Sequence, residues 1–310
     1  MSPHSSERTR LAVAGARAAT ETMLGKQPQG DVVRSRMFTT MLFFFLSMAL
    51  LGLALLLVYV FIDGLPRFGL ELFTEKGSGF PEEAGFQNAI LGTLWVIGGV
   101  IAICVPLGVG AALYLEEYAN KERWYNRWIE VNIQNLAAVP SIVYGILGLA
   151  FVVRGPLDLG PIIFAGSITL ALLVLPTVII AAREAIRAVP PSIREGSLAL
   201  GATRWQTIRR QVLPASIPGI VTGVILAISR AIGETAPLLL VGAATFVTFN
   251  PNGPFQEGYT TLPVQIFQYF TRAQEEYKIL AAAGIIVMLI LLISMNSFAV
   301  WLRNRYEQSW

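Results

Sequence analysis

Two opposite charges, Arg230 and Glu234, lie inside a long apolar stretch of the second half of the chain. A charge at the centre of a membrane helix costs about 2.5–3.5 kcal/mol, so such residues face a bundle interior or a water-filled path. The guanidinium of Arg230 forms a planar fork that binds a tetrahedral oxyanion through two parallel hydrogen bonds. We interpret the pair as a cationic station for an anion, in which Glu234 neutralises Arg230 when no anion is bound. The alternative is a buried ion pair that only fixes helix packing.

The segment around this pair is expected to be a helix that can bend. The four-residue spacing places Arg230 and Glu234 on one helical face, with the Arg first, which is the weaker order for helix stability. Gly233 and Pro237 allow the backbone to kink or unwind at this point. Thr235 follows Glu234 directly and joins the residues that we expect to line a substrate pathway.

A second polar group lies in an earlier apolar stretch, at Ser141 and Tyr144. Their three-residue spacing puts both hydroxyls on one side of a helix. Two interpretations stay open at this point. The hydroxyls line the same pathway, or they bond to neighbouring helices, as Ser and Tyr in membrane helices often do.

The loop at 183–214 carries signals for two short helices. Ser192 with Glu195, and Thr203 with Gln206, have the spacing of capping boxes. Gly201 suits the residue after a helix, because glycine takes a positive φ without steric cost. We therefore expect two helices with a tight turn at 201–203, a structured surface that suits a soluble partner. The alternative is that these residues form only a cap and a turn.

The composition places these elements in a membrane. Hydrophobic residues make up 54% of the chain and charged residues only 14%, against about 25% charged in soluble domains. Apolar runs long enough to cross a core of about 30 Å predict one all-α domain at 38–310, after a disordered basic tail at 1–37. The six expected spans are 38–62, 88–113, 133–153, 161–182, 215–242 and 279–302.

The cations are distributed unevenly over the two ends of these spans. The tail, the loops at 114–132 and 183–214 and the end at 303–310 hold 17 Lys and Arg, whereas the three other loops hold five. Cytoplasmic segments carry the excess of Lys and Arg, so both termini and the 183–214 loop are expected in the cytosol. This bias accounts for the net charge of +3, which is therefore no sign of nucleic-acid binding.

Several kinds of chemistry lack the residues they need. No Gly-x-x-x-x-Gly-Lys-Ser/Thr phosphate loop occurs, so the chain is not itself an ATPase of the usual kind. Cys104 is the only cysteine and lies in a predicted span, where we expect a small buried side chain, and His4 is the only histidine. These counts leave no intrachain disulfide, no catalytic triad and no expected metal site or bound cofactor.

The chain resembles the A-type permease subunit of the bacterial phosphate ABC importers (the Pst system). The resemblance covers 38–310, and its 183–214 loop is similar to the "EAA" loop with which ABC permeases seat a cytosolic ATPase. Its most specific pieces are 139–145, 195–214, 230–240, 261–266 and 295–306. The sequence departs from the usual loop at Gly196 and Ser197, which replace two alanines, and at Gln211, which replaces an isoleucine.

This resemblance implies a type I ABC importer permease in the cytoplasmic membrane that carries inorganic phosphate. It implies as partners a second, C-type permease, two ATPases that use ATP and Mg²⁺, and an extracytoplasmic phosphate-binding protein. It also implies that Arg230 acts in phosphate passage. The residues expected to couple to the ATPase are Glu195, Gly201, Ala202, Trp205, Leu213 and Pro214. Rival functions are a permease for sulfate or molybdate and a stand-alone secondary anion carrier.

The first prediction concerns orientation and follows from the uneven cations. In a Cys104→Ser background, single cysteines at Phe80 and Phe255 should react with a membrane-impermeant thiol reagent in whole cells. Cysteines at Gly30 and Thr203 should react only after the membrane is opened, which serves as the control. Labelling at Thr203 from outside would overturn the orientation.

Overall fold

A computed structural model gives the fold of the chain and describes residues 29–120, 122–243 and 246–306. Two compact units result, Met1–Tyr59 and Val60–Trp310. The described part of the first unit belongs to one long apolar helix, α2 (Gln29–Gly64). Because α2 begins at Gln29, residues 29–37 are helical, and the predicted boundary of the disordered tail at 37 is too late. The rest of that predicted tail, with His4, lies outside the described residues.

Within the described residues, five helical segments are long and apolar enough to cross a membrane. This agrees with five of the six predicted spans, although most of the segments run past the predicted ends and Arg204–Gly233 stops short of the predicted end at 242. They are Val33–Arg67, Gln87–Tyr118, Ile163–Arg187, Arg204–Gly233 and Glu275–Arg305.

The predicted third span, 133–153, is not one helix. It consists of α5 (Trp124–Ala137) and α6 (Ser141–Leu147), which continues into a π-helical turn, η3 (Gly148–Val153). The two halves are bent by 104°. Pro140 is the physical reason, because a proline disfavours helical geometry in the residue before it. The predicted start at 133 therefore falls in the middle of α5.

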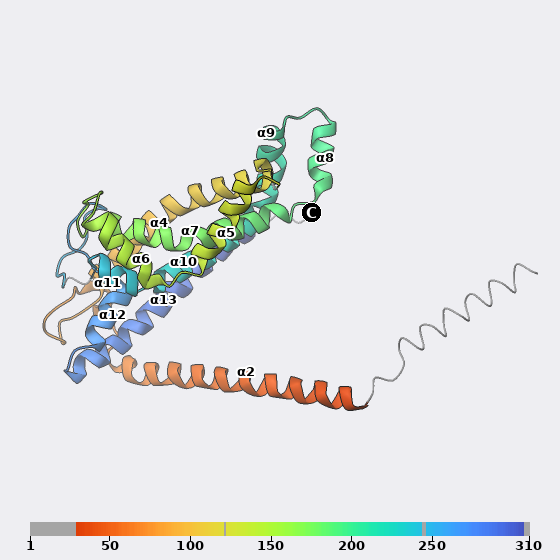
Figure 1. Ribbon diagram of the computed structural model, residues 1–310. Helices are drawn as coiled ribbons and strands as arrows, with labels where there is room; N and C mark the ends of the chain where they lie inside the picture. The colour runs from red at the N-terminus through yellow and green to blue at the C-terminus, as the bar shows by residue number, and fades with distance from the viewer. Residues whose placement is uncertain (1–28, 121, 244–245, 307–310) are drawn as a thin grey trace, which may run out of the picture. The chain divides into compact units, whose positions relative to one another are not determined.

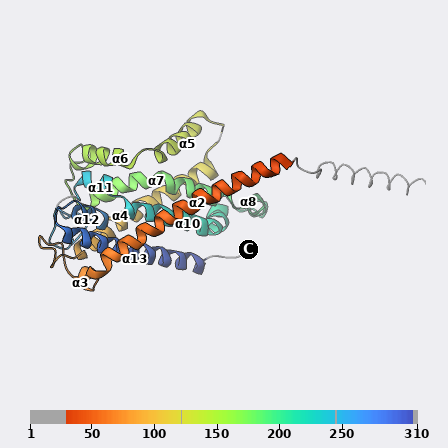
Figure 2. The ribbon, with the colours of Figure 1, turned by 90° about the horizontal axis from the view of Figure 1, so that it is seen from below.

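The second unit is built around α7 (Ile163–Arg187). In the most apolar stretch of this helix, 67% of the residues are buried. α7 packs against α4 (Gln87–Leu113) and α10 (Leu213–Gly233), with α5 and α6 also beside it (Figures 1 and 2). The core between these helices contains Val100, Leu170 and Val174.

Small residues allow α10 to approach α7 closely. Gly219 and Gly223, one turn apart on α10, face Ala185 and Ala181 on α7. A methyl group added at Gly219 would lie 2.7 Å from Ala185 Cβ, which is too close for the present packing. Such small-residue faces are typical of helices that associate in membranes, where no hydrophobic force drives them together.

The predicted fifth span, 215–242, is also broken. α10 ends at Gly233, and the backbone of Glu234 is extended. α11 (Ala236–Val241) follows and ends before Gly242, whose φ is 111°. This confirms the predicted unwinding near Gly233. α11 packs on α6, so the shorter halves of the two broken spans support each other.

Short helices lie at the end of the unit opposite α8 (Pro191–Ala199) (Figures 1 and 2). These are η1 (Leu65–Arg67), α3 (Glu71–Thr74) and α12 (Leu262–Phe270), and α12 packs on the last helix, α13 (Glu275–Tyr306). The rings of Tyr269 and Tyr277 lie 5.3 Å apart, with the Arg272 guanidinium 4.3 Å from the Tyr277 ring. Burial raises the pKa of Tyr259 and of Tyr269 above that of an ordinary phenol.

The second prediction tests the contact between the broken spans. In Gly145→Ala the new Cβ would lie 2.7 Å from Pro237 Cα, so α6 and α11 must move apart. We expect this to cost about 1–3 kcal/mol, seen as a lower unfolding midpoint in detergent. Gly98→Ala is the matched control, because a Cβ at Gly98 meets nothing within 4 Å. Equal midpoints for the two variants would contradict the tight contact.

Candidate functional site: a helical loop joined to a charged helix end

The 183–214 loop begins with α8, which the sequence places correctly but caps differently. Pro190 is the N-cap and Pro191 the first helical residue, and no side chain caps the helix. The predicted capping box of Ser192 and Glu195 is therefore wrong. The fixed φ of Pro191 suits the first helical position, which moves Ser192 into the helix. Gly201 ends the segment with φ of 84°, as predicted.

The second half of the loop has the predicted capping box. The Thr203 hydroxyl accepts a bond from Gln206 N (3.3 Å), and Thr203 N donates to Gln206 Oε1 (2.9 Å) at the start of α9 (Arg204–Thr207). However, α9 is not a separate short helix. It continues through η4 (Ile208–Val212) into α10, so one helical rod runs over Arg204–Gly233.

The rod stays helical through Pro214, although a proline at this position would normally break a helix. A proline ring clashes with the carbonyl four residues earlier, here that of Arg210. η4 is a wider, π-helical turn that ends at Val212, just before Leu213 and Pro214, and it makes room for the proline ring. Leu213 packs in the cluster around Val212 and Ile186. Leu213 and Pro214 thus mark a junction within one helix.

Large apolar side chains are exposed on the outer surface of the loop, beside charged ones. Leu200 is 91% and Trp205 58% exposed, and Glu195 is also exposed, whereas Ala202 is half-buried. A hollow of about 390 Å³ separates the two halves of the loop. Its lining includes Ser192, Gly196, Leu200, Ala202, Gln206 and Arg210.

The other end of the rod carries the predicted charged pair. Arg230 lies in the last turn of α10, and its Nε is 3.4 Å from Glu234 Oε1. Glu234 is not on the helix, because α10 ends at Gly233, so the expected common helical face is wrong although the pair forms. The Arg230 side chain is 49% exposed and that of Glu234 17%. Beside them, the Ser229 hydroxyl bonds to Asn296 Oδ1 on α13 (2.6 Å), a contact that the sequence did not reveal.

The remaining predicted pathway residues lie at the two helix breaks. Ser141 begins α6 and is half-buried, and Thr235 precedes α11. Tyr144 is buried, and its hydroxyl donates to the Leu136 carbonyl of α5 at 2.9 Å. This bond favours the interpretation in which Tyr144 joins neighbouring helices, here the two halves of the bent span.

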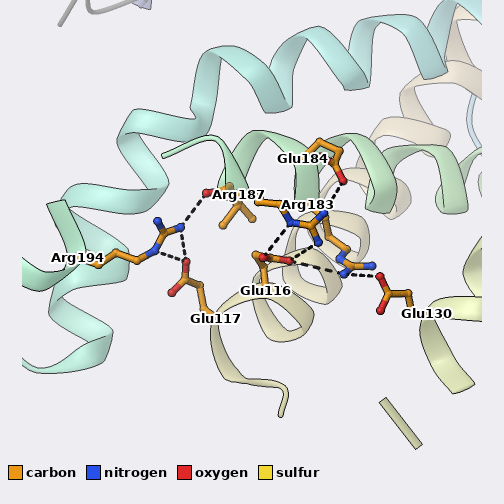
Figure 3. A network of polar contacts seen from close by, with 8 residues as sticks. Glu116, Glu117, Glu130, Arg183, Glu184, Arg187 and Arg194 are labelled. Carbon is orange, nitrogen blue, oxygen red and sulfur yellow. Dashed lines mark hydrogen bonds and ion pairs between the residues drawn. The ribbon is translucent and has the colours of Figure 1, made fainter. Parts of the chain in front are cut away.

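A cluster of ion pairs near the loop was not predicted from the sequence (Figure 3). Glu116 Oε1 and Oε2 accept bonds from Arg187 at 3.2 and 3.1 Å, and Arg183 bonds to Glu130 at 2.9 Å. These bonds connect α7 to α5 and to η2 (Tyr114–Tyr118), a π-helical turn at the end of α4. The signal available in the sequence was acidic residues at one span end and arginines at another, but spacing alone cannot pair them.

The fold and the loop define a class, the membrane-spanning permease subunits of type I ABC importers. A bacterial ABC transporter involved in alginate import aligns with a TM-score of 0.64 at 17% identity, over 90% of this chain and 99% of the other. The methionine transporter MetNI, in an inward-facing form, aligns with a TM-score of 0.55 at 16% identity over 71% and 94%.

The chain belongs to the family of binding-protein-dependent transport system inner membrane components, whose model matches residues 104–308. Among its relatives is the phosphate transport system permease protein PstA of Yersinia pestis, 36% identical, with 82% of this chain and 86% of the relative covered. PstA of Haemophilus influenzae is 32% identical over 80% and 86%. The probable ABC transporter permease YqgI of Bacillus subtilis is 31% identical over 79% and 86%.

The third prediction concerns the turn between α8 and α9. Gly201→Val places a β-branched residue at φ of 84°, where even an ordinary residue costs about 1–2 kcal/mol. We expect the two helices to shift, so that the subunit inserts normally but co-purifies poorly with its ATPase. Gly201→Asn is the control, because asparagine tolerates a left-handed conformation. Full ATPase recovery with Gly201→Val would contradict a docking role for the turn.

Proposed function

We propose that this chain is the permease subunit of an ATP-driven importer of inorganic phosphate in the bacterial cytoplasmic membrane. The names of the PstA relatives support phosphate as the substrate. The observation that carries the proposal is Arg230: a half-exposed guanidinium at a helix break, held by one partner at 3.4 Å. Such a group suits phosphate, because its oxygens accept the paired hydrogen bonds that a guanidinium donates.

The exposure of Arg230 also supports a second permease subunit. A charge near the membrane interior is costly in contact with lipid, so its open side should face water or protein. A homologous, C-type subunit packed against this chain would enclose that side and form a path between the two. Glu234 would then release Arg230 to an arriving anion and pair with it again after the anion leaves.

The continuous rod supports a mechanism of coupling. At about 1.5 Å per residue, the segment Arg204–Gly233 is about 45 Å long and joins the loop to the turn that holds Arg230. Two cytosolic ATPases, which bind the ATP and Mg²⁺ that this chain does not bind, would seat on the exposed surface of α8 and α9. Their closure would move the rod and with it Arg230, and so open the path to the other side.

This mechanism requires the orientation that the cations predict, with both termini and the loop in the cytosol. An extracytoplasmic phosphate-binding protein would then deliver its anion at the end of the unit where α3 and α12 lie. The docking residues Glu195, Ala202 and Trp205 lie on the surface that faces the ATPase in this arrangement.

The fourth prediction separates the anion station from a structural ion pair. In reconstituted vesicles, Arg230→Gln should lower uptake of labelled phosphate by about 10- to 100-fold, the loss of a charged hydrogen-bond group worth about 1.5–3 kcal/mol. Arg230→Lys should lose less, because it keeps the charge but not the fork. Assembly with the ATPase should be unchanged in both.

The double variant Arg230→Gln with Glu234→Gln provides the control. A structural pair predicts that removing both charges restores assembly and uptake together, since a single removal leaves one charge unpaired. Normal uptake by the double variant would show that Arg230 is structural. Competition by excess sulfate or molybdate tests the substrate, and uptake without ATP would indicate a secondary carrier.

A further inference from the structure

The coupling helix α8 is held to the membrane helices mainly by one arginine. None of its residues is buried, so apolar packing contributes little beyond the partial cover of Ile193. Ser197 reaches only to Thr207 of α9, at 2.9 Å. Arg194, by contrast, points back towards the helix ends and away from the exposed surface (Figure 3).

Arg194 contacts two different membrane helices. Its Nε and Nη2 donate to Glu117 Oε1 on η2 at 3.0 and 2.8 Å. Its Nη1 donates to the carbonyl of Val189, just after α7, at 2.6 Å, and its Nη2 to the carbonyl of Ile186, in the last turn of α7, at 2.8 Å. One guanidinium therefore joins α8 to the ends of α4 and α7. A planar guanidinium spreads its five donors over three nitrogens, which fits these separated acceptors, whereas a lysine donates from a single nitrogen.

Glu117 is placed so that it needs this partner. It is 7% exposed, and a buried carboxylate without a partner is strongly unfavourable. The π-helical turn η2 directs two consecutive carboxylates into the bundle: Glu117 meets Arg194, and Glu116 meets Arg187 of α7. The end of α4 is thus tied both to α7 and to the coupling helix.

We propose that Arg194 is a positioning residue that forms, with Glu117, a latch between the coupling helix and the ends of α4 and α7. Through this latch, movement of α8 is transmitted to α4 and α7 while the rod carries the movement of α9 to α10. The two halves of the loop therefore act on different membrane helices. This inference rests on the proposed docking of an ATPase at the loop.

The fifth prediction uses a variant that removes both charges, Arg194→Gln with Glu117→Gln, so that no buried carboxylate is left unpaired. In the reconstituted complex we expect normal ATPase recovery and ATP hydrolysis, but at least a 10-fold lower ratio of phosphate imported to ATP hydrolysed. Arg194→Lys should give an intermediate ratio, because it keeps the charge but loses the fork. Arg209→Gln is the matched control, the same change at an exposed residue of the same loop, and should keep the wild-type ratio.

A purely structural role predicts a different result. The double variant would then be recovered in lower yield or with a lower unfolding midpoint, but its surviving complexes would keep the wild-type ratio. A wild-type ratio of phosphate imported to ATP hydrolysed in the double variant, measured on assembled complexes only, would overturn the latch.

A measurement without phosphate separates this inference from the proposed function. In a Cys104→Ser background, spin labels at Leu107 on α4 and Ile217 on α10 report their distance with and without ATP. We expect the ATP-dependent change in the double variant to differ from that in wild type, because α10 still moves with the rod whereas α4 no longer follows α8. If the wild-type complex imports no phosphate but the two proteins still differ in this distance change, the proposed function fails and the latch stands. An equal change in both proteins would reject the latch.

Discussion

The close approach of α10 to α7 is the contact on which the other features depend. Gly219 and Gly223 lie against Ala185 and Ala181, and no larger side chain fits between the two helices. In a membrane, where lipid is as apolar as the side chains, such close backbone packing supplies much of the attraction between helices. The rod is thereby fixed to the most buried helix of the unit, with the loop at one end and Arg230 at the other.

Interruptions of helical geometry shape both ends of the unit. Backbone groups freed by a break must be satisfied inside the protein, since lipid offers no hydrogen bonds. The break before Ser141 is bridged by the bond from Tyr144 to Leu136, and the Glu234 amide bonds back to Ala231. At the other end, π-helical turns at η2 and η4 turn Glu117 inward and make room for Pro214. Such turns are frequent at functional sites.

The charges of the chain are likewise divided between its two ends. Near the loop, arginines and carboxylates pair in short, partly buried contacts, among them Arg194 with Glu117 at 2.8 Å. At the end of α10, Arg230 has only a longer contact with Glu234 and is half-exposed. Paired charges hold helices in place, whereas an incompletely paired cation remains available to an anion. On this contrast we propose a mechanical role for the first group and a binding role for the second.

The sequence alone determined the membrane class, five of the six spans, the Thr203–Gln206 cap, the turn at Gly201 and the burial of Cys104, whose thiol bonds to the Ala171 carbonyl. These features depend on local composition and spacing, which a single chain segment carries by itself. The tertiary structure decided the bend at Pro140, the continuity of α9 with α10 and the partners of Arg194. Pro140 and Pro214 are both visible in the sequence, yet the chain bends at the first and stays helical at the second, because the widened turn η4 makes room for the second ring. Glu117, the partner of Arg194, lies 77 positions away, and no local spacing encodes that pairing.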